Sequence, residues 1–202
     1  MGRFGRNPRV DCGGVSSILF VCTGNICRSP TAEGFGRAMV AGPGGRIDVS
    51  SAGIVGWEGS PAARESVQAA GECGIDISRH IARRLEERHV RDADVIVCMS
   101  AEHRDAVIRM VPDAAGKTFT LKELVRLLEA LTFTPEASFS ERVARADELR
   151  TSGFEGDPHD EDVADPLGAT MDSFRAVAWE LEEWTRRLAP GLIPAAARQE
   201  VS

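Results

Sequence analysis

The stretch SILFVCTGNICRSP, residues 17–30, constrains the fold more than any other part of the sequence. A short apolar run ends at Cys22, and Arg28 follows six residues later. An apolar run of this length before a glycine-containing loop is typical of a buried strand. The Ser-Pro pair that closes the stretch is typical of a helix start, with serine at the cap and proline in the first turn. The stretch therefore predicts a strand, a loop and a helix, with Cys22, Cys27 and Arg28 between strand and helix.

Strand-like and helix-like segments alternate along the rest of the chain. The predicted strands cover 17–22, 46–53, 94–99 and 117–121, and the predicted helices cover 29–42, 61–74, 101–111, 121–131 and 170–188. Such alternation favours right-handed crossovers between parallel strands. We therefore expect an α/β fold with helices on both faces of a parallel sheet. Ligands of such folds bind beyond the carboxyl ends of the strands, where the loop after the first strand lies.

The length of 202 residues fits one domain. We expect a folded domain over 15–189, with a disordered extension over 1–14 and a flexible tail over 190–202. The segment 132–162 is acidic and carries glycine and proline near its ends, with a weak helical pattern over 137–149. This composition predicts a mobile insertion.

Composition argues against several classes of protein. The net charge of −7 disfavours a nucleic-acid-binding protein, and no apolar run approaches the ~18 residues of a membrane span. The five cysteines include no CxxC pair, and the four histidines lack metal-binding spacing. We therefore expect a cytoplasmic protein with reduced thiols, no metal and no cofactor. The alanine- and arginine-rich composition without tyrosine suggests a bacterial source.

The loop after the first strand has the features of a phosphate site. Backbone N–H groups that point into such a loop form an anion nest, and the following helix adds the positive end of its dipole. Arg28 supplies a planar fork for two phosphate oxygens. Gly24 lets the backbone approach the anion, and Asn25 tolerates a left-handed turn. The residues that we expect to bind the phosphorylated substrate here are Thr23, Gly24, Asn25, Ile26, Cys27 and Ser29.

Cys22 is the predicted nucleophile of this site. A thiolate is favoured at a helix N-terminus beside a cation, and it can attack phosphorus. Ser29 would donate to the sulfur and help it leave in the second step. An ester leaving group also needs a proton. In the stretch DVADPLG, Asp165 before Pro166 is our choice for the acid, with Asp162 the weaker candidate.

With these residues assembled, the chain resembles the low-molecular-weight protein tyrosine phosphatases. The stretch VCTGNICRSPTAE is similar to that family's phosphate loop, and the resemblance covers most of 17–188. It implies a four-stranded parallel sheet with the phosphate loop between the first strand and the first helix. It also implies a cysteinyl-phosphate intermediate on Cys22 without a metal. Arg28 would clamp the phosphate, and Asp165 would act first as general acid and then as base.

Three further residues take roles only through the resemblance. The stretch SSAGIVGWEGSP is similar to the family's loop beside the pocket, so Trp57 would form a wall against the substrate ring. Ser51 and His80 fall where the family has hydrogen bonds that support the loop asparagine, here Asn25, together with Ser29. Judged without the resemblance, Trp57 would be a core residue and His80 a structural histidine.

The resemblance implies a phosphotyrosine protein as substrate, a cognate tyrosine kinase as partner, and inhibition by phosphate or vanadate. However, Leu167 and Gly168 follow the Asp-Pro pair where many members carry aromatic residues. One aromatic wall of the pocket is therefore missing, which weakens the case for strong selectivity towards phosphotyrosine.

Three alternatives to a phosphotyrosine phosphatase remain open. A protein arginine phosphatase of the same fold is favoured by DPLG, which is close to the DPFG of that branch, but Ile26 stands where that branch tends to have threonine. A thioredoxin-coupled arsenate reductase needs two more closely spaced cysteines, whereas Cys73 and Cys98 are 25 residues apart. A non-catalytic phosphate-binding module would have lost the thiol, the arginine or the acid, and all three are present.

Cys27 has two interpretations. It is either a small apolar residue packed under the loop or a redox guard that traps oxidised Cys22 as a reversible disulfide. The resemblance to animal members with the same cysteine pair implies the second.

Overall fold

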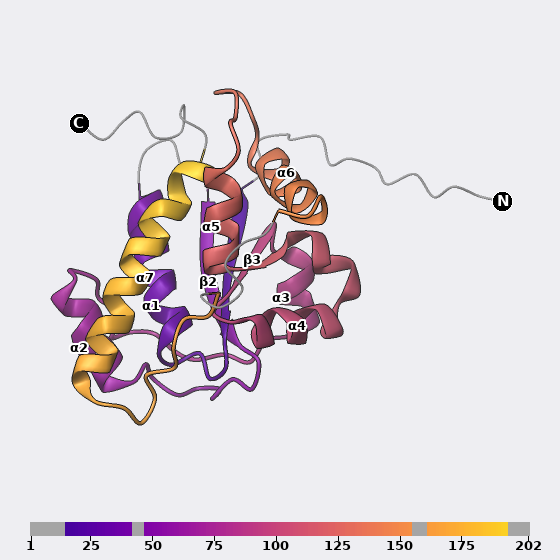
Figure 1. Ribbon diagram of the computed structural model, residues 1–202. Coiled ribbons are helices and arrows are strands. Elements are labelled where there is room, and N and C mark those ends of the chain that lie inside the picture. Colours follow the sequence, from indigo (N-terminus) through magenta and orange to yellow (C-terminus); the bar gives the residue numbers. More distant parts are fainter. Residues whose placement is uncertain (1–14, 42–46, 155–160, 194–202) are drawn as a thin grey trace.

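The computed structural model describes residues 15–41, 47–154 and 161–193, built around one parallel sheet (Figure 1). Its strands are β1 (Ser16–Cys22), β2 (Ile47–Gly53), β3 (Val95–Cys98) and β4 (Thr118–Thr120), in the spatial order β2-β1-β3-β4. The end of the central strand β1 is held from both sides, because Cys22 pairs with Gly53 and Val21 pairs with Cys98. The predicted α/β fold with a four-stranded parallel sheet is confirmed.

Helices cover both faces of the sheet. They are α1 (Arg28–Val40), α2 (Arg64–Glu72), α3 (Glu87–Asp92), α4 (Ala101–Met110), the 3₁₀ helix η1 (Pro112–Lys117), α5 (Leu121–Glu129), α6 (Phe139–Thr151) and α7 (Met171–Leu192). Figure 1 shows α1 and α7 on one side of the sheet and α3 and α4 on the other.

The side chains of β1 alternate between two cores. Phe20 and Cys22 point into the core that contains α1, α5, α6 and α7, whereas Leu19 and Val21 point towards α3, α4 and η1. Because alternate residues of a strand face opposite sides, an apolar run such as β1 is the pattern expected for a strand buried on both faces. Cys22 thus ends β1 with its side chain buried.

Several helix assignments differ from those expected, and three of the differences bear on the site or the core. The helix α1 begins at Arg28 with Cys27 at its N-cap, so Ser29 lies inside the first turn. The six-residue helix α3 was not predicted, because only Val90 of its side chains is buried and no apolar periodicity marks it. The helix α7 continues to Leu192, beyond the predicted end at 188, and Leu192 is fully buried.

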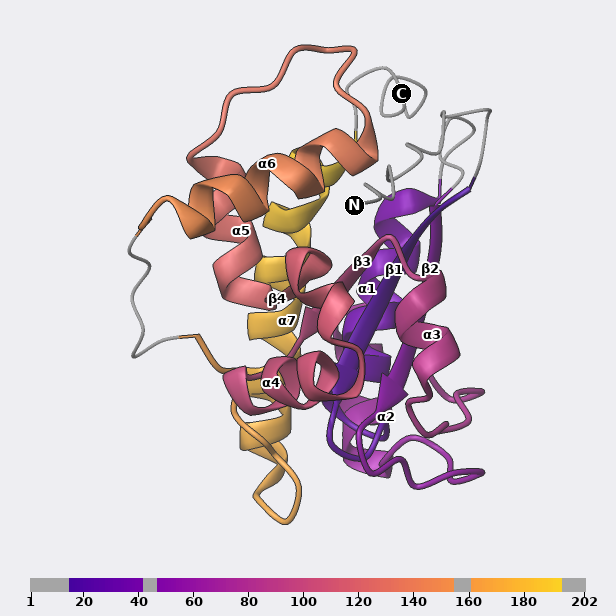
Figure 2. The same ribbon diagram turned by 90° about the vertical axis from the view of Figure 1, so that its right-hand side faces the viewer.

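The segment 132–162 contains α6, which extends the predicted helical pattern to Thr151 (Figure 2). This helix packs against α5, η1 and α7. Arg142 Nη1 donates to the carbonyl of Gly191, and Arg150 Nη1 donates to the carbonyl of Thr118. Mobility of the segment stays a prediction. The expected disordered extension over 1–14, and residues 194–202 of the expected flexible tail, lie outside the described residues.

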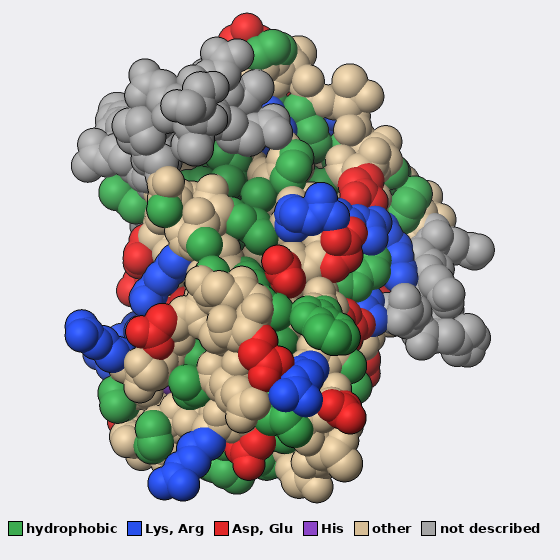
Figure 3. Space-filling model, turned by 90° about the vertical axis from the view of Figure 1, so that its left-hand side faces the viewer, with side chains coloured by type: hydrophobic (Ala, Val, Ile, Leu, Met, Phe, Trp, Pro, Cys, Tyr) green, Lys and Arg blue, Asp and Glu red, His purple; other side chains and the backbone are tan. Residues whose placement is uncertain are grey.

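Acidic and basic side chains are mixed on the face over α2 and α7 (Figure 3). Arg175 forms an ion pair with Glu72, and Arg187 forms one with Glu129. Exposed pairs of this kind contribute little to stability individually. None of the helices in the described ranges combines the length and the hydropathy of a membrane-spanning segment.

Candidate active site

The loop after β1 turns sharply at one residue. Asn25 has a φ of +59°, and its side chain is completely buried. Asparagine tolerates this left-handed conformation better than most other L-residues. The turn carries the chain from the end of β1 to α1 across the carboxyl edge of the sheet, where Cys22 and Arg28 come together.

The carbonyl groups of the loop are turned outwards. The carbonyls of residues 22–26 accept hydrogen bonds from neighbouring segments, and the donors are Ile54, Val55, Gly56, Trp57, His80 and Ala63. Since the two sides of a peptide unit point in opposite directions, this arrangement leaves the loop N–H groups to face its centre. A ring of inward N–H groups at a helix N-terminus is an anion-binding nest.

The Cys22 sulfur lies among hydrogen-bond partners. The Ser29 hydroxyl is 3.0 Å from Cys22 Sγ, and the Asn25 backbone N–H donates to the same atom over 3.3 Å. Ser29 therefore lies in the first turn of α1 and faces the sulfur instead of capping the helix. Both contacts suit a sulfur that carries negative charge.

Buried side chains support the loop from behind. The Asn25 amide donates to Ser29 Oγ (2.9 Å) and Ser51 Oγ (2.7 Å), and its carbonyl oxygen accepts from the backbone N–H of Arg83 (2.9 Å). Ser51 in turn donates to the buried carboxylate of Glu33. The predicted partners Asn25, Ser29 and Ser51 are thus brought together, and Glu33 and Arg83 complete the network.

His80 supports the same turn through the backbone. Its Nε2–H donates to the Asn25 carbonyl over 2.8 Å, and its Nδ1 lies 3.9 Å from Glu33. Burial lowers the pKa of His80, so the imidazole is neutral at neutral pH. The side chain is therefore a fixed donor to the loop.

Arg28 is buried and has three acceptors. Its Nη1 donates to the Val163 carbonyl (3.1 Å), and its Nη2 donates to Thr23 Oγ1 (3.1 Å) and Asp165 Oδ2 (2.5 Å). Only 6% of the Arg28 side chain is exposed. The guanidinium is thus held in one orientation at the mouth of the loop.

The two candidate acids lie in different environments. Asp165 reaches the loop through Arg28 and keeps 45% of its side chain exposed, whereas the carboxylate of Asp162 accepts from the Ala101 N–H at the start of α4. Val163 between them donates its N–H to the Met99 carbonyl at the end of β3. This geometry favours Asp165 as the acid and gives Asp162 a structural contact.

The entrance of the site is partly apolar. The Trp57 ring packs over Gly24, next to Ile26, and Trp57 is 46% exposed. Leu167 on the Asp165 loop is 48% exposed. Gly53 lies behind the loop, where an added Cβ would be 2.7 Å from the Thr23 carbonyl oxygen. The end of β2 therefore has no room for a side chain against the loop.

His103 is a site residue that the sequence did not reveal. Its Nε2 is 2.9 Å from Thr23 Oγ1, and its Nδ1 is 2.7 Å from Ser100 Oγ at the N-cap of α4. Burial, with the positive charge of Arg28 as a second cause, lowers the pKa of His103 to about 4. The only sequence signal was the local Ser100–His103 spacing at a helix start, because the contact with Thr23 spans 80 residues.

The other described cysteines are buried to different extents. Burial raises the pKa of the Cys27 thiol to about 11, and Cys27 packs with Ile26 and Phe174. Cys98 is fully buried in β3, and burial raises its pKa as well. Cys73 follows α2 and is half-buried. Cys98 is thus unsuited to the thiol exchange that an arsenate reductase requires.

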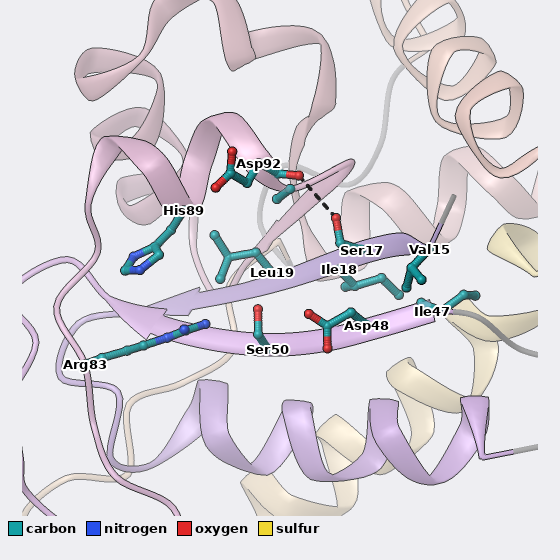
Figure 4. Close-up of a pocket in the computed structure, with 11 residues that line it drawn as sticks. Val15, Ser17, Ile18, Leu19, Ile47, Asp48, Ser50, Arg83, His89 and Asp92 are labelled. Carbon is teal, nitrogen blue, oxygen red and sulfur yellow. Dashed lines mark hydrogen bonds between the residues drawn. The ribbon is translucent and has the colours of Figure 1, made fainter. Parts of the chain in front are cut away.

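A groove of about 720 Å³ lies beside the sheet between α3 and the edge strand β2 (Figure 4). Arg83 and His89 lie at one end of it, and Asp48 and Ser50 line the strand side. Arg83 lines this groove and also contacts the hydrogen-bond network behind the loop, because its Nε donates to the Ser51 carbonyl over 2.7 Å.

Among the described residues, no group of three His, Cys, Asp or Glu side chains is placed to hold a metal ion. The expectation that no metal or cofactor is needed stays a prediction.

The family model for low molecular weight phosphotyrosine protein phosphatase matches residues 17–132. A protein-arginine-phosphatase from Geobacillus stearothermophilus is 34% identical over 175 residues, which cover 87% of this chain and 95% of that protein. The probable low molecular weight protein-tyrosine-phosphatase AmsI of Erwinia amylovora is 39% identical over 104 residues, or 52% of this chain and 69% of that protein. The crystal structure of a low molecular weight protein tyrosine phosphatase from T. tengcongensis has a TM-score of 0.67 and 34% identity, covering 88% of this chain and 99% of the other.

Proposed function

The chain belongs to the low molecular weight phosphotyrosine protein phosphatase family, and we propose that it removes phosphate from phosphorylated protein side chains through Cys22. The single observation that carries this proposal is the loop geometry. Its carbonyls accept hydrogen bonds from surrounding segments, which leaves its N–H groups to face inwards, and the Cys22 sulfur lies beside Ser29 and accepts from the Asn25 N–H.

The proposed reaction has two steps. In the first, the Cys22 thiolate bonds to phosphorus, the bond to the leaving group breaks, and Asp165 protonates that group. In the second, Asp165 takes a proton from water, the water oxygen bonds to phosphorus, and the thiolate leaves with help from Ser29. Arg28 and the loop N–H groups stabilise the charge of the transferring phosphoryl group.

For the substrate, we propose phosphoarginine in proteins. Support comes from the Geobacillus protein-arginine-phosphatase, which matches over nearly its full length, whereas the match to AmsI covers about half of this chain. The exposed Leu167 is also consistent, since a guanidino group does not need an aromatic wall on the Asp165 side. The overall similarity thus favours a protein arginine phosphatase, which the sequence left as an alternative, over the phosphotyrosine phosphatase that was expected.

Phosphotyrosine is the second candidate, favoured by one specific feature. The buried Ile26 side chain lies beside Gly24 and the exposed Trp57 ring, and this apolar lining suits an aromatic substrate. For either substrate, we expect a cytoplasmic enzyme that acts on a phosphoprotein made by a cognate kinase. We also expect phosphate or vanadate to inhibit it.

Turnover of matched phosphoarginine and phosphotyrosine peptides tests the proposal. We expect kcat/KM to be at least about tenfold higher for phosphoarginine. Ile26→Thr should raise that ratio further if Ile26 limits access of the branched group. The reverse preference in the parent chain would make phosphotyrosine the substrate. Cys22→Ser should bind phosphate without turnover, and residual hydrolysis by this variant would refute the mechanism.

A further inference from the structure

The Thr23 hydroxyl lies between two nitrogen atoms. Arg28 Nη2 donates to Thr23 Oγ1 over 3.1 Å, and His103 Nε2 lies 2.9 Å from the same oxygen. Thr23 directly follows Cys22 and is exposed, whereas His103 is only 5% exposed. The direction in which the Thr23 hydroxyl hydrogen points therefore depends on which nitrogen of His103 carries a proton.

His103 is neutral at neutral pH, since burial lowers its pKa to about 4. One ring nitrogen then donates and the other accepts. The choice between them is set at the opposite end of the ring, where Nδ1 is 2.7 Å from the hydroxyl of Ser100.

The buried Ser100 hydroxyl settles the tautomer. Its oxygen accepts from the His103 backbone N–H, and its hydrogen needs an acceptor because buried polar groups are paired. Within the described residues, His103 Nδ1 is the acceptor in reach. Nδ1 therefore accepts from Ser100, and Nε2 carries the ring hydrogen and donates to Thr23.

Thr23 Oγ1 then accepts two hydrogen bonds, from Arg28 and from His103. A hydroxyl oxygen has two acceptor sites and one donor hydrogen, so its hydrogen is left for a third partner. We propose that this hydroxyl donates to an oxygen of the phosphate bound in the loop, and that His103 is the positioning residue that directs the hydrogen there. This inference rests on the proposed function, because it requires phosphate in the loop.

Calorimetric titration with inorganic phosphate measures this contact without turnover. Thr23→Val removes the hydroxyl at nearly constant volume and should weaken phosphate binding about tenfold, as loss of a hydrogen bond to a charged group does. Thr23→Ser keeps the hydroxyl and should bind phosphate like the parent. Thr132→Val, which changes an exposed threonine outside the loop, is the matched control.

His103 is tested through its coupling to Thr23. His103→Leu should weaken phosphate binding, and His103→Gln, which restores an N–H donor, should recover part of the loss. If His103 acts through the Thr23 hydroxyl, adding His103→Leu to Thr23→Val should not weaken phosphate binding any further. If His103 has only a structural role, the fold-losses in phosphate affinity of the two single variants should multiply in the double variant.

The outcomes distinguish the proposed function from the proposed role of Thr23. A parent chain that does not bind phosphate refutes the proposed function together with this inference. A parent that binds phosphate, with Thr23→Val binding equally well, refutes this inference alone. Thr23 is exposed, so Thr23→Val decides the hydroxyl contact even if His103→Leu does not fold, and His103→Gln then tests the positioning role.

Discussion

Arg28 Nη2 donates to Asp165 Oδ2 across 2.5 Å, so the proposed phosphate clamp and the proposed acid form a hydrogen-bonded ion pair. The guanidinium is buried and the carboxylate is half-exposed. A phosphate dianion that takes the same N–H must displace the carboxylate. We therefore expect phosphate binding to release the Asp165 carboxylate from Arg28.

Asp165→Asn is expected to lower kcat far more for substrates with poor leaving groups than for those with good ones. Only a poor leaving group needs a proton in the transition state. A series of aryl phosphates with graded leaving-group pKa measures this. Equal losses across the series would point to another acid.

Asp165→Ala is expected to tighten inorganic phosphate binding while it lowers turnover. The substitution removes both the competitor for Arg28 and a like charge beside the dianion. Titration calorimetry gives the affinity. Asp48→Ala, which removes one exposed carboxylate from β2, controls for net charge and should leave the affinity near that of the parent. An unchanged affinity in Asp165→Ala would mean that the ion pair does not compete.

Asn25→Ala is expected to lower the free energy of unfolding by about 2–4 kcal/mol. The substitution places alanine at a φ of +59° and removes the amide that bonds Ser29, Ser51 and the Arg83 N–H. Urea denaturation provides the measurement. Asn25→Gly loses the same amide without the backbone strain, so it should be the more stable of the two variants.

Cys27 is predicted to protect Cys22 from irreversible oxidation. Peroxide would convert Cys22 to a sulfenic acid, and the Cys27 sulfur would displace its hydroxyl to form a disulfide that added thiol reduces. Because burial raises the pKa of Cys27 to about 11, disulfide formation should accelerate as the pH rises.

Activity before and after treatment with peroxide and then with thiol tests that role. The parent should recover, and Cys27→Ala should recover less. Equal recovery would leave Cys27 as a packing residue next to Ile26 and Phe174.

His103 should make the fold less stable in acid. Its pKa is lowered from 6.5 to about 4, so the unfolded chain binds a proton that the folded chain does not. The free energy of unfolding should therefore fall by up to about 3 kcal/mol as the pH is lowered from about 6.5 towards 4. Urea denaturation of His103→Gln should show a flatter pH profile, whereas His89→Gln should keep most of the slope. A parental slope in His103→Gln would contradict the assignment.

The conformation of the loop after β1 was predictable because its determinants are contiguous. The strand, the left-handed Asn25, Arg28 and the helix start lie within 16–31 and act through local geometry. The alternation of strands and helices predicted the fold class for a similar reason, since each element carries its own apolar pattern.

The contacts that complete the site were not predictable in this way. Thr23 meets His103 across 80 positions, and Asn25 meets the Arg83 backbone N–H across 58. Backbone donors have no side-chain signature, and a single histidine has no periodicity. The helix cap was misplaced at Ser29 because its cap-like sequence serves the Cys22 sulfur.

Val163 limits how much of the loop that carries Asp165 can move. Its N–H is bonded to Met99, its carbonyl is bonded to Arg28, and its side chain is 1% exposed. We therefore expect the backbone rotation that moves Asp165 to be confined to the two residues after Val163, because the φ of Pro166 is fixed. A segment of this length is expected to move on the nanosecond-to-microsecond timescale of loops. We therefore expect the proposed acid to move without any rearrangement of the α6 segment.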